Sequence, residues 1–331
     1  MKLSIFNYLL FSPSYILTLP FKKQNGANNY FPYVHLSNSN PFIYERITDF
    51  VVFGDSYSQV NTNLTDMSYT GKNRSRGKNW PVQLIDLHPM KMWNFAEAGA
   101  TVDMSIINRD SHDFKTQCHN FTKLIKDKKT TGEWGKVGLF AIWIGSNDIR
   151  SMDRKIQNKE EIYDRIMIEM FKMIDVLYQN GARNLLIINV PPLEKIPFNK
   201  DGSFNEVSVD VDYMNNLLSK NIQSFADTHS DTNIFLYDIH HRINEIINHC
   251  TQYKFKDCRS DWRKHKIESI KLYFWSDLSH PTYQANEFFS NDIHGFLTIT
   301  SKLKFLIYKY FNYKYIYTLF LKKFINMSYI N

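Results

Sequence analysis

A serine follows an apolar run near the start of the chain, where the sequence DFVVFGDS occupies residues 49–56. Far downstream, an aspartate and a histidine three residues apart, Asp277 and His280, precede Pro281. A serine hydroxyl becomes a strong nucleophile when a histidine accepts its proton and an aspartate orients that histidine. We therefore predict acyl-transfer chemistry, with Ser56 as nucleophile, His280 as general base and then acid, and Asp277 as the partner that orients His280.

Acyl transfer also needs hydrogen-bond donors for the oxyanion of its tetrahedral intermediate. The sequence AGA at 98–100 contains Gly99, and the sequence GSND at 145–148 contains Asn147. Backbone N–H groups and amide side chains are suitable donors, and a glycine brings its N–H close to a substrate without an intervening Cβ. We expect the N–H groups of Ser56 and Gly99 and the side chain of Asn147 to form the oxyanion hole.

These residues can meet only if the elements before them end at one place. Apolar runs without alternation, which predict buried parallel strands, occupy residues 49–54, 92–96, 137–145, 184–190 and 233–239. Helical spacing is found at 159–179, at 210–227 and after Pro281. This alternation predicts an α/β fold, a three-layer αβα domain with a mostly parallel sheet. Ligands bind beyond the carboxyl ends of such strands, which is where Ser56 and Asn147 fall.

Four sequence blocks resemble those of the GDSL-type esterases and lipases of the SGNH hydrolase superfamily. They are GDSY at 54–57, AGA at 98–100, GSND at 145–148 and DLSHPT at 277–282, with Tyr57 where the family name has leucine. The resemblance implies a flavodoxin-like sheet, ester hydrolysis without a cofactor, and the residue roles given above. The longer stretches WIGSNDI and FWSDLSHPT are similar to fungal acetylesterases of the carbohydrate esterase group.

The function that this resemblance favours is removal of acetyl groups from plant-type polysaccharides or oligosaccharides through an acyl-enzyme. A small-molecule or polysaccharide ester would be the substrate. One alternative is a lipase or phospholipase-like acylhydrolase. Another is a non-catalytic sugar- or lipid-binding protein on the same fold, and the intact set Ser56, Asn147, Asp277 and His280 argues against it.

Other polar and aromatic residues near the blocks are expected to have structural roles. Asp55 should brace the turn after the first strand, and Asp148 should brace its own loop. Trp143 and Trp275 flank the blocks and either line a sugar or acyl pocket or, for Trp143, belong to the core. The pair at 240–241, two histidines, has no nearby cysteine or acidic cluster, so we expect no metal site.

The charge of the chain is concentrated at its C-terminal end. The net charge is +7, and residues 301–331 contain six lysines but no Asp, Glu or Arg. Subtracting these six leaves about +1 for the rest, which is not the basic patch of a nucleic-acid-binding domain. We expect a leader and linker at 1–44, a hydrolase domain at 45–300 and a basic aromatic tail at 301–331. The tail either lies outside the core or contacts a membrane surface.

Three cysteines are too few for a disulfide-built scaffold. Cys250 and Cys258 lie eight residues apart and can pair. Cys118 is then the remaining cysteine, and it belongs to no motif. Residues 1–20 resemble a weak signal peptide. Glycosylation sequons begin at Asn63, Asn73 and Asn120. We therefore expect a secreted protein in which Cys250 and Cys258 form a disulfide.

Overall fold

The computed structural model describes residues 30–109, 112–127, 133–153, 155–199 and 206–302. Within these residues a six-stranded sheet has the order β1-β6-β5-β4-β2-β3. Its strands are β1 (Tyr33–His35), β2 (Asp49–Gly54), β3 (Lys91–Asn94), β4 (Gly138–Trp143), β5 (Asn184–Ile188) and β6 (Asn233–Tyr237). All neighbours pair in parallel except β1, which runs antiparallel to β6 at one edge. The predicted α/β class with a mostly parallel sheet is confirmed.

The strand order reverses beside β2. From β2 the chain passes to β3 on one side and then to β4 on the other side, as in flavodoxin-like sheets. Gly54 at the end of β2 pairs in register with Trp143 at the end of β4. The turn that carries Ser56 and the loop that carries Asn147 therefore start from adjacent strands, at the point where such sheets bind ligands.

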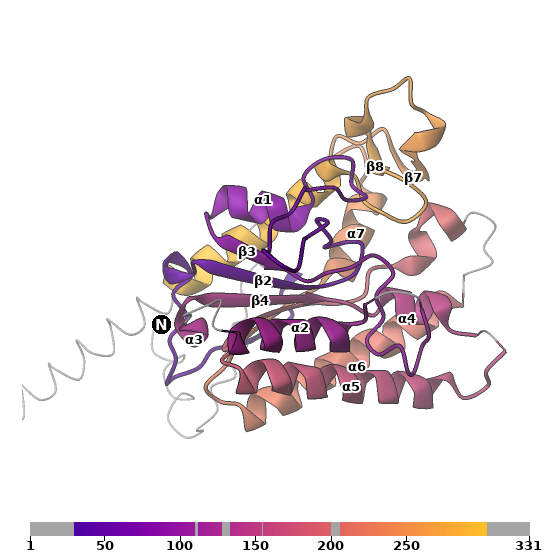
Figure 1. The fold of residues 1–331 in the computed structure, drawn as a ribbon. Coiled ribbons are helices and arrows are strands. Elements are labelled where there is room, and N and C mark those ends of the chain that lie inside the picture. The colour runs from indigo at the N-terminus through magenta and orange to yellow at the C-terminus, as the bar shows by residue number, and fades with distance from the viewer. Residues whose placement is uncertain (1–29, 110–111, 128–132, 154, 200–205, 303–331) are drawn as a thin grey trace, which may run out of the picture.

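Helices cover both faces of the sheet (Figure 1). One face is covered by α2 (Phe114–Lys126), α5 (Lys159–Gln179) and α6 (Val207–Thr228), and the other by α1 (Trp80–Leu87), α7 (Ile239–Asn248) and a helix at 283–302. The short helices α3 (Trp134–Val137) and α4 (Ser146–Ser151) precede and follow β4. Single 3₁₀ turns are η2 (Tyr44–Arg46), η3 (Leu193–Lys195), η4 (Pro197–Asn199), η5 (Trp262–Lys264) and η6 (Ile270–Leu272).

Each central strand is apolar on both faces because each face meets a separate helical layer. In β2, Val51 and Phe53 pack into the cluster under α2, α5 and α6, whereas Phe50 and Val52 pack into the cluster under α1, α7 and 283–302. All four side chains are fully buried. Burial of both faces explains why the strands read as continuous apolar runs without alternation.

The three helices predicted from residue spacing are present, the last of them at 283–302. Helix α5 has the predicted bounds, and it buries the stripe that includes Ile166, Met170 and Leu177. Helix α6 begins at Val207, three residues earlier than the prediction, and ends at Thr228. Both pack on the sheet through the apolar stripe that the sequence shows.

The expected linker at 1–44 extends too far, because residues 30–44 belong to the fold. Residues 33–35 form β1, whose Val34 pairs with Phe235 of β6. Phe31 stacks on Phe296, with ring centroids 3.7 Å apart, and Phe42 is also buried. The sequence signal was weak because the strand is three residues long and surrounded by Asn, Ser and Pro. Residues 1–29 lie outside the described residues.

The expected boundary at residue 300 also needs correction, because the last helix continues to residue 302. Ser301 is buried, and its Oγ accepts a hydrogen bond from the N–H of Tyr44 (3.0 Å) and donates one to Glu45 Oε2 (2.7 Å). The rest of the predicted tail, 303–331, lies outside the described residues. Among the residues described, none of the helices is both long and apolar enough to cross a membrane.

A two-stranded parallel sheet, β7 (Asp257–Asp261) and β8 (Tyr273–Trp275), stands apart from the main sheet. The loop before β7 is closed by a disulfide between Cys250 and Cys258, as predicted. Strand β8 ends at Trp275, directly before the segment that contains Asp277 and His280. The last sequence block therefore begins where this small sheet ends.

Candidate active site

Ser56 lies in a sharp turn at the end of β2. Gly54 has φ +144°, and a Cβ there would overlap the carbonyl oxygen of Trp143, so this position requires glycine. The side chain of Gln117 on α2 holds both sides of Gly54, accepting from its N–H (2.9 Å) and donating to its carbonyl (2.8 Å). After the turn, Asp55 Oδ1 accepts the N–H of Tyr57 at 2.9 Å, as expected for a bracing residue. Ser56 itself is left partly exposed.

Asp277 and His280 are held by a tight loop after β8. Asp277 Oδ1 accepts the backbone N–H groups of Ser279 (2.9 Å) and His280 (3.0 Å). The N–H of Ser276 donates to the carbonyl of His280 at 2.8 Å and closes the loop. The three-residue spacing thus places the carboxylate beside the imidazole through local backbone geometry.

The structure brings the three residues together in one hydrogen-bonded chain. Ser56 Oγ lies 2.7 Å from His280 Nε2, and His280 Nδ1 lies 2.7 Å from Asp277 Oδ1. Burial by itself raises the pKa of Asp277, but the hydrogen bonds from His280 and Ser279 and the charge of His280 outweigh it and lower this pKa to about 2. Asp277 is therefore ionised at neutral pH, which fixes the Nδ1–H tautomer of His280 and leaves Nε2 to accept the Ser56 proton.

The other two predicted site residues lie on the next two loops. Asn147 is on the first turn of α4, and its Nδ2 donates to the carbonyl of Ala100 at 2.9 Å. The same Nδ2 is 3.4 Å from Asp55 Oδ2, a long contact that leaves its second hydrogen weakly engaged. Gly99 precedes Ala100 and has φ +90°, in the region that favours glycine. Asn147 is thus tied both to the turn of Gly99 and to the turn of Ser56.

Two carboxyl groups are buried behind this site. Asp148 is fully buried and accepts the N–H of Val102 (3.0 Å), which braces the loop containing Gly99, in agreement with the expectation for this residue. Burial raises the pKa of Asp148 and of Asp55 to about 7 each, although backbone N–H donors partly offset it. Both groups therefore titrate near neutral pH.

Trp143 and Trp275 do not line an open pocket, contrary to one of the two expectations. Trp143 has 1% and Trp275 0% of its surface exposed. Trp143 stacks on Tyr57 with centroids 4.8 Å apart, and Trp275 donates to the carbonyl of Cys258 at 2.9 Å. Tyr57 in turn donates to the carbonyl of Ser279 at 3.1 Å. The two tryptophans therefore support the Ser56 turn and the His280 loop from inside the core.

Sequence reasoning missed the residues that line the cavity beside Ser56 and His280. Besides these two, the lining consists of Tyr57, Arg74, Ser75, Asn79, Pro281 and Asn286. Its volume is about 10 Å³, so the cavity is small. The sequence signal for Arg74 was the run GKNRSRGK at 71–78, which has a basic residue at every second position.

The remaining candidates take no part in this cluster. His240 and His241 start α7, and the described residues contain no group of three or more His, Cys, Asp or Glu side chains placed to hold a metal. Cys118 is fully buried on α2, and burial raises its pKa well above the ordinary value, which makes the thiol unreactive.

A doubly wound sheet with a Ser–His–Asp chain at the carboxyl ends of its strands defines an α/β serine hydrolase.

Comparison with known proteins identifies the family. The model of the GDSL-like Lipase/Acylhydrolase family matches residues 50–293. The chain belongs to this family and is a carboxylic ester hydrolase of the GDSL type.

The relatives share limited identity with the chain. An acetylesterase of Thermothelomyces thermophilus is 27% identical over 229 residues, which cover 62% of this chain and 76% of the relative. A GDSL esterase/lipase of Arabidopsis thaliana is 26% identical over 184 residues, 45% of this chain and about half (49%) of that relative. The solved structure of Axe2, an acetylxylan esterase from Geobacillus stearothermophilus, is similar with 12% identity and a TM-score of 0.43. The match covers 76% of this chain and 96% of the Axe2 chain.

Proposed function

We propose that the protein is an acetylesterase that removes acetyl groups from plant-type polysaccharides or their oligosaccharides. The observation that carries the proposal is the hydrogen-bonded chain from Ser56 through His280 to Asp277, with 2.7 Å at each step. The acetylesterase of Thermothelomyces thermophilus, which is similar to this chain, supports the choice of acyl group.

The reaction follows from the roles of these side chains. Ser56 Oγ attacks the ester carbonyl while His280 Nε2 takes its proton, and the imidazolium formed is stabilised by ionised Asp277. The oxyanion accepts hydrogen bonds from the N–H groups of Ser56 and Gly99 and from Asn147. His280 then gives this proton to the departing sugar oxygen, which leaves as a hydroxyl group. Water, deprotonated by His280, releases acetate from Ser56 in the second half-reaction.

A chain-length series of 4-nitrophenyl esters, from acetate to palmitate, tests the proposal. We expect the highest kcat/KM on acetate, and we expect Ser56→Ala to lose more than about 10⁴-fold of kcat with an unchanged melting temperature. Ser224→Ala, the same substitution at an exposed position of α6, is the matched control.

The alternatives predict other results. A maximum on long-chain esters would indicate a lipase or phospholipase-like acylhydrolase instead. Absence of Ser56-dependent turnover on every ester would indicate a non-catalytic binding protein, and would contradict the assignment of the site.

We also propose that the protein is secreted. The Cys250–Cys258 disulfide supports this, because such bonds persist mainly in oxidising compartments. Peptide mapping of protein from its natural source, without reductant, should give the linked Cys250 and Cys258 peptides from the extracellular fraction. Recovery from the cell interior with both thiols free would reject the proposal.

A further inference from the structure

A basic loop borders the cavity of Ser56. The segment 71–78, GKNRSRGK, which we call the cationic loop, carries Lys72, Arg74, Arg76 and Lys78. Lys78 is neutralised by Asp86 of α1 at 2.6 Å. The other three cations are exposed, and none forms an ion pair with a residue that the structure describes. The loop therefore presents uncompensated positive charge to solvent.

Side-chain hydrogen bonds within the cationic loop hold its shape. Asn73 Nδ2 donates to the carbonyls of Gly71 and Gly77, at 2.8 Å each. Asn73 Oδ1 accepts the N–H of Ser75 (2.8 Å) and its hydroxyl (2.6 Å). Both ends of one amide thus span the loop, so the cations project from a fixed backbone.

Two contacts anchor the loop to the segment that carries the catalytic histidine. The hydroxyl of Ser276, next to Asp277, donates to the carbonyl of Arg74. The N–H of Tyr283 donates to the carbonyl of Ser75 at 2.8 Å. Gly77 lies so close to the ring of Tyr283 that a Cβ would be only 2.7 Å from it. The position of the loop relative to Ser56 and His280 is therefore built into the fold.

Arg74 is the one permanent charge among the residues that line the cavity. Ser56, His280, Arg74 and five uncharged residues form that lining. The lining contains no acidic residue, and the exposed Arg74 forms no ion pair with a described residue, so its side chain is available to a negative charge on a substrate that binds there. Guanidinium groups pair well with carboxylates because two parallel N–H groups match the two oxygens.

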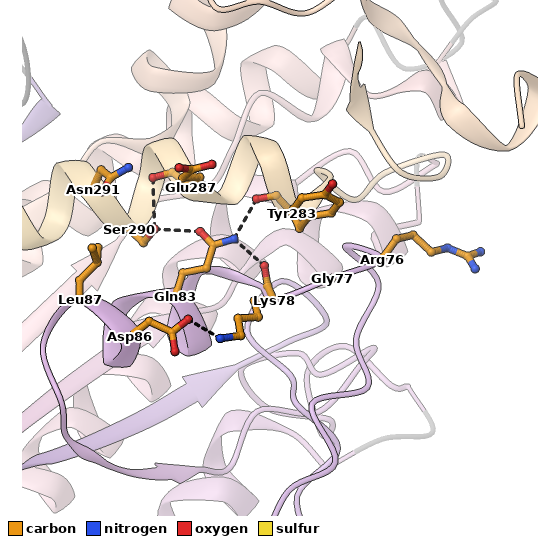
Figure 2. Close-up of a pocket in the computed structure, with 10 residues that line it drawn as sticks. All are labelled: Arg76, Gly77, Lys78, Gln83, Asp86, Leu87, Tyr283, Glu287, Ser290 and Asn291. Carbon is orange, nitrogen blue, oxygen red and sulfur yellow. Dashed lines mark hydrogen bonds and ion pairs between the residues drawn. The ribbon is translucent and has the colours of Figure 1, made fainter. Parts of the chain in front are cut away.

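The other half of the cationic loop borders a larger groove. Arg76, Gly77 and Lys78 line it together with residues of α1 and of the helix 283–302, and its volume is about 550 Å³. Figure 2 shows Lys78 directed at Asp86, whereas Arg76 extends away from the other side chains drawn. One loop thus borders both the cavity of Ser56 and a groove with room for neighbouring sugar units.

We propose that the cationic loop, through Arg74, selects esters whose alcohol part is acidic, namely acetylated oligosaccharides that contain uronic acids. The inference rests on the proposed acetylesterase function and adds the charge of the sugar. A carboxylate on or beside the acetylated sugar would pair with Arg74 while the acetyl carbonyl meets Ser56. An anionic lipid would offer similar charge, but the similarity to an acetylesterase favours an acetyl ester over a fatty one.

The test uses two substrates that differ only in charge. Acetylated galacturonate oligosaccharides are compared with the same oligosaccharides after conversion of each carboxylate to its amide, and acetate release gives kcat/KM. We expect about a fivefold preference for the charged form at low salt, and we expect 0.5 M NaCl to reduce it. Arg74→Ala should bring the ratio of kcat/KM on the charged substrate to kcat/KM on the amide close to one, mainly by raising KM for the charged substrate. Arg74→Lys should restore part of the preference.

The matched control is Arg46→Ala, which removes the same charge from an exposed site before β2, at the opposite end of that strand from Ser56. This variant should keep the wild-type ratio. The inference is overturned if the wild type shows no charge preference while hydrolysing 4-nitrophenyl acetate, or if Arg74→Ala keeps the preference. Faster turnover of an anionic phospholipid than of the acetylated uronates would also overturn it. Loss of all Ser56-dependent acetate hydrolysis would instead reject the proposed function itself.

Discussion

The side chain of Asp277 organises the site with a single oxygen atom. Oδ1 accepts the N–H of Ser279, the N–H of His280 and the Nδ1–H of His280. The same three donors that fix the loop also lower the pKa of the carboxyl group. Because one oxygen both fixes the loop and orients the imidazole, the Asp-x-x-His spacing brings together two of the three residues of the proposed triad. Ser56 is the part that must come from elsewhere in the fold.

At the residue scale, Asn147→Ala should lower kcat by about 10²–10³ with a smaller change in KM. The Asn147 amide would donate to an oxyanion that exists only in the transition state and intermediate, so its loss spares ground-state binding. Steady-state kinetics on 4-nitrophenyl acetate measure both constants. A raised KM with unchanged kcat would show instead that Asn147 binds the neutral ester.

Elements position the site through loops that are braced by buried groups. Asp148 on α4 ties the loop after β3 to the loop after β4 through Val102, and the disulfide ties the end of α7 to β7. Neither contact reaches Ser56 directly. Each one keeps an element in register with its neighbour, so their removal should affect stability before chemistry.

Asp148→Asn should make the stability of the protein less dependent on pH between about pH 4 and pH 7. The folded pKa of about 7 is higher than the unfolded value of about 3.9, so the stability that Asp148 contributes is complete below about pH 4 and is lost as the pH rises through 7. Asparagine keeps an acceptor for Val102 without a charge. Melting temperatures at pH 5, 6, 7 and 8 should fall more for the wild type than for the variant. Parallel curves of melting temperature against pH for the wild type and the variant would contradict this prediction. The control is Asp212→Asn at an exposed site of α6.

Loss of the disulfide should lower stability while activity at 25 °C is retained. For the short loop between Cys250 and Cys258, the double change to serine should cost about 2–3 kcal/mol, or about 5–10 °C in melting temperature. Dithiothreitol should lower the melting temperature of the wild type by a similar amount and leave that of the double variant unchanged. An equal response of both proteins to dithiothreitol would mean that the bond does not constrain the fold.

At the scale of the whole molecule, both ends of the described chain close the same layer. Residues 30–44 and the helix 283–302 pack together through Phe31 and Phe296, and Ser301 hydrogen-bonds to Tyr44 and Glu45. The domain therefore includes more of its N-terminal segment, and slightly more of its C-terminal helix, than the sequence pattern indicated.

Truncation separates the domain from the tail. A chain that ends at residue 302 should keep the kcat/KM and melting temperature of the full chain, because every contact described for the site lies between residues 54 and 286. A chain that ends at 299 should be less stable by about 1–3 kcal/mol, since the buried N–H of Tyr44 loses its acceptor. Loss of activity in the 302-residue chain would mean that later residues contribute to the site.

Local patterns were enough for much of this molecule. The strands from β2 to β6 and the bounds of α5 were predictable because burial on both faces, or on one helical face, leaves a periodic record in neighbouring residues. Gly54, Gly99 and the Asp277–His280 pair were predictable because each needs a particular backbone conformation or spacing, which a short block specifies.

The tertiary structure decided everything that depends on contacts between distant segments. β1 exists because β6 offers an edge, and Gln117 supports Ser56 because α2 lies beside the end of β2. Trp143 and Trp275 resemble pocket residues in sequence, yet packing buries both. Arg74 belongs to the site only because Ser276 and Tyr283 hold its loop there. Such contacts join residues many positions apart, and their energies depend on a geometry that no local pattern of residue types contains.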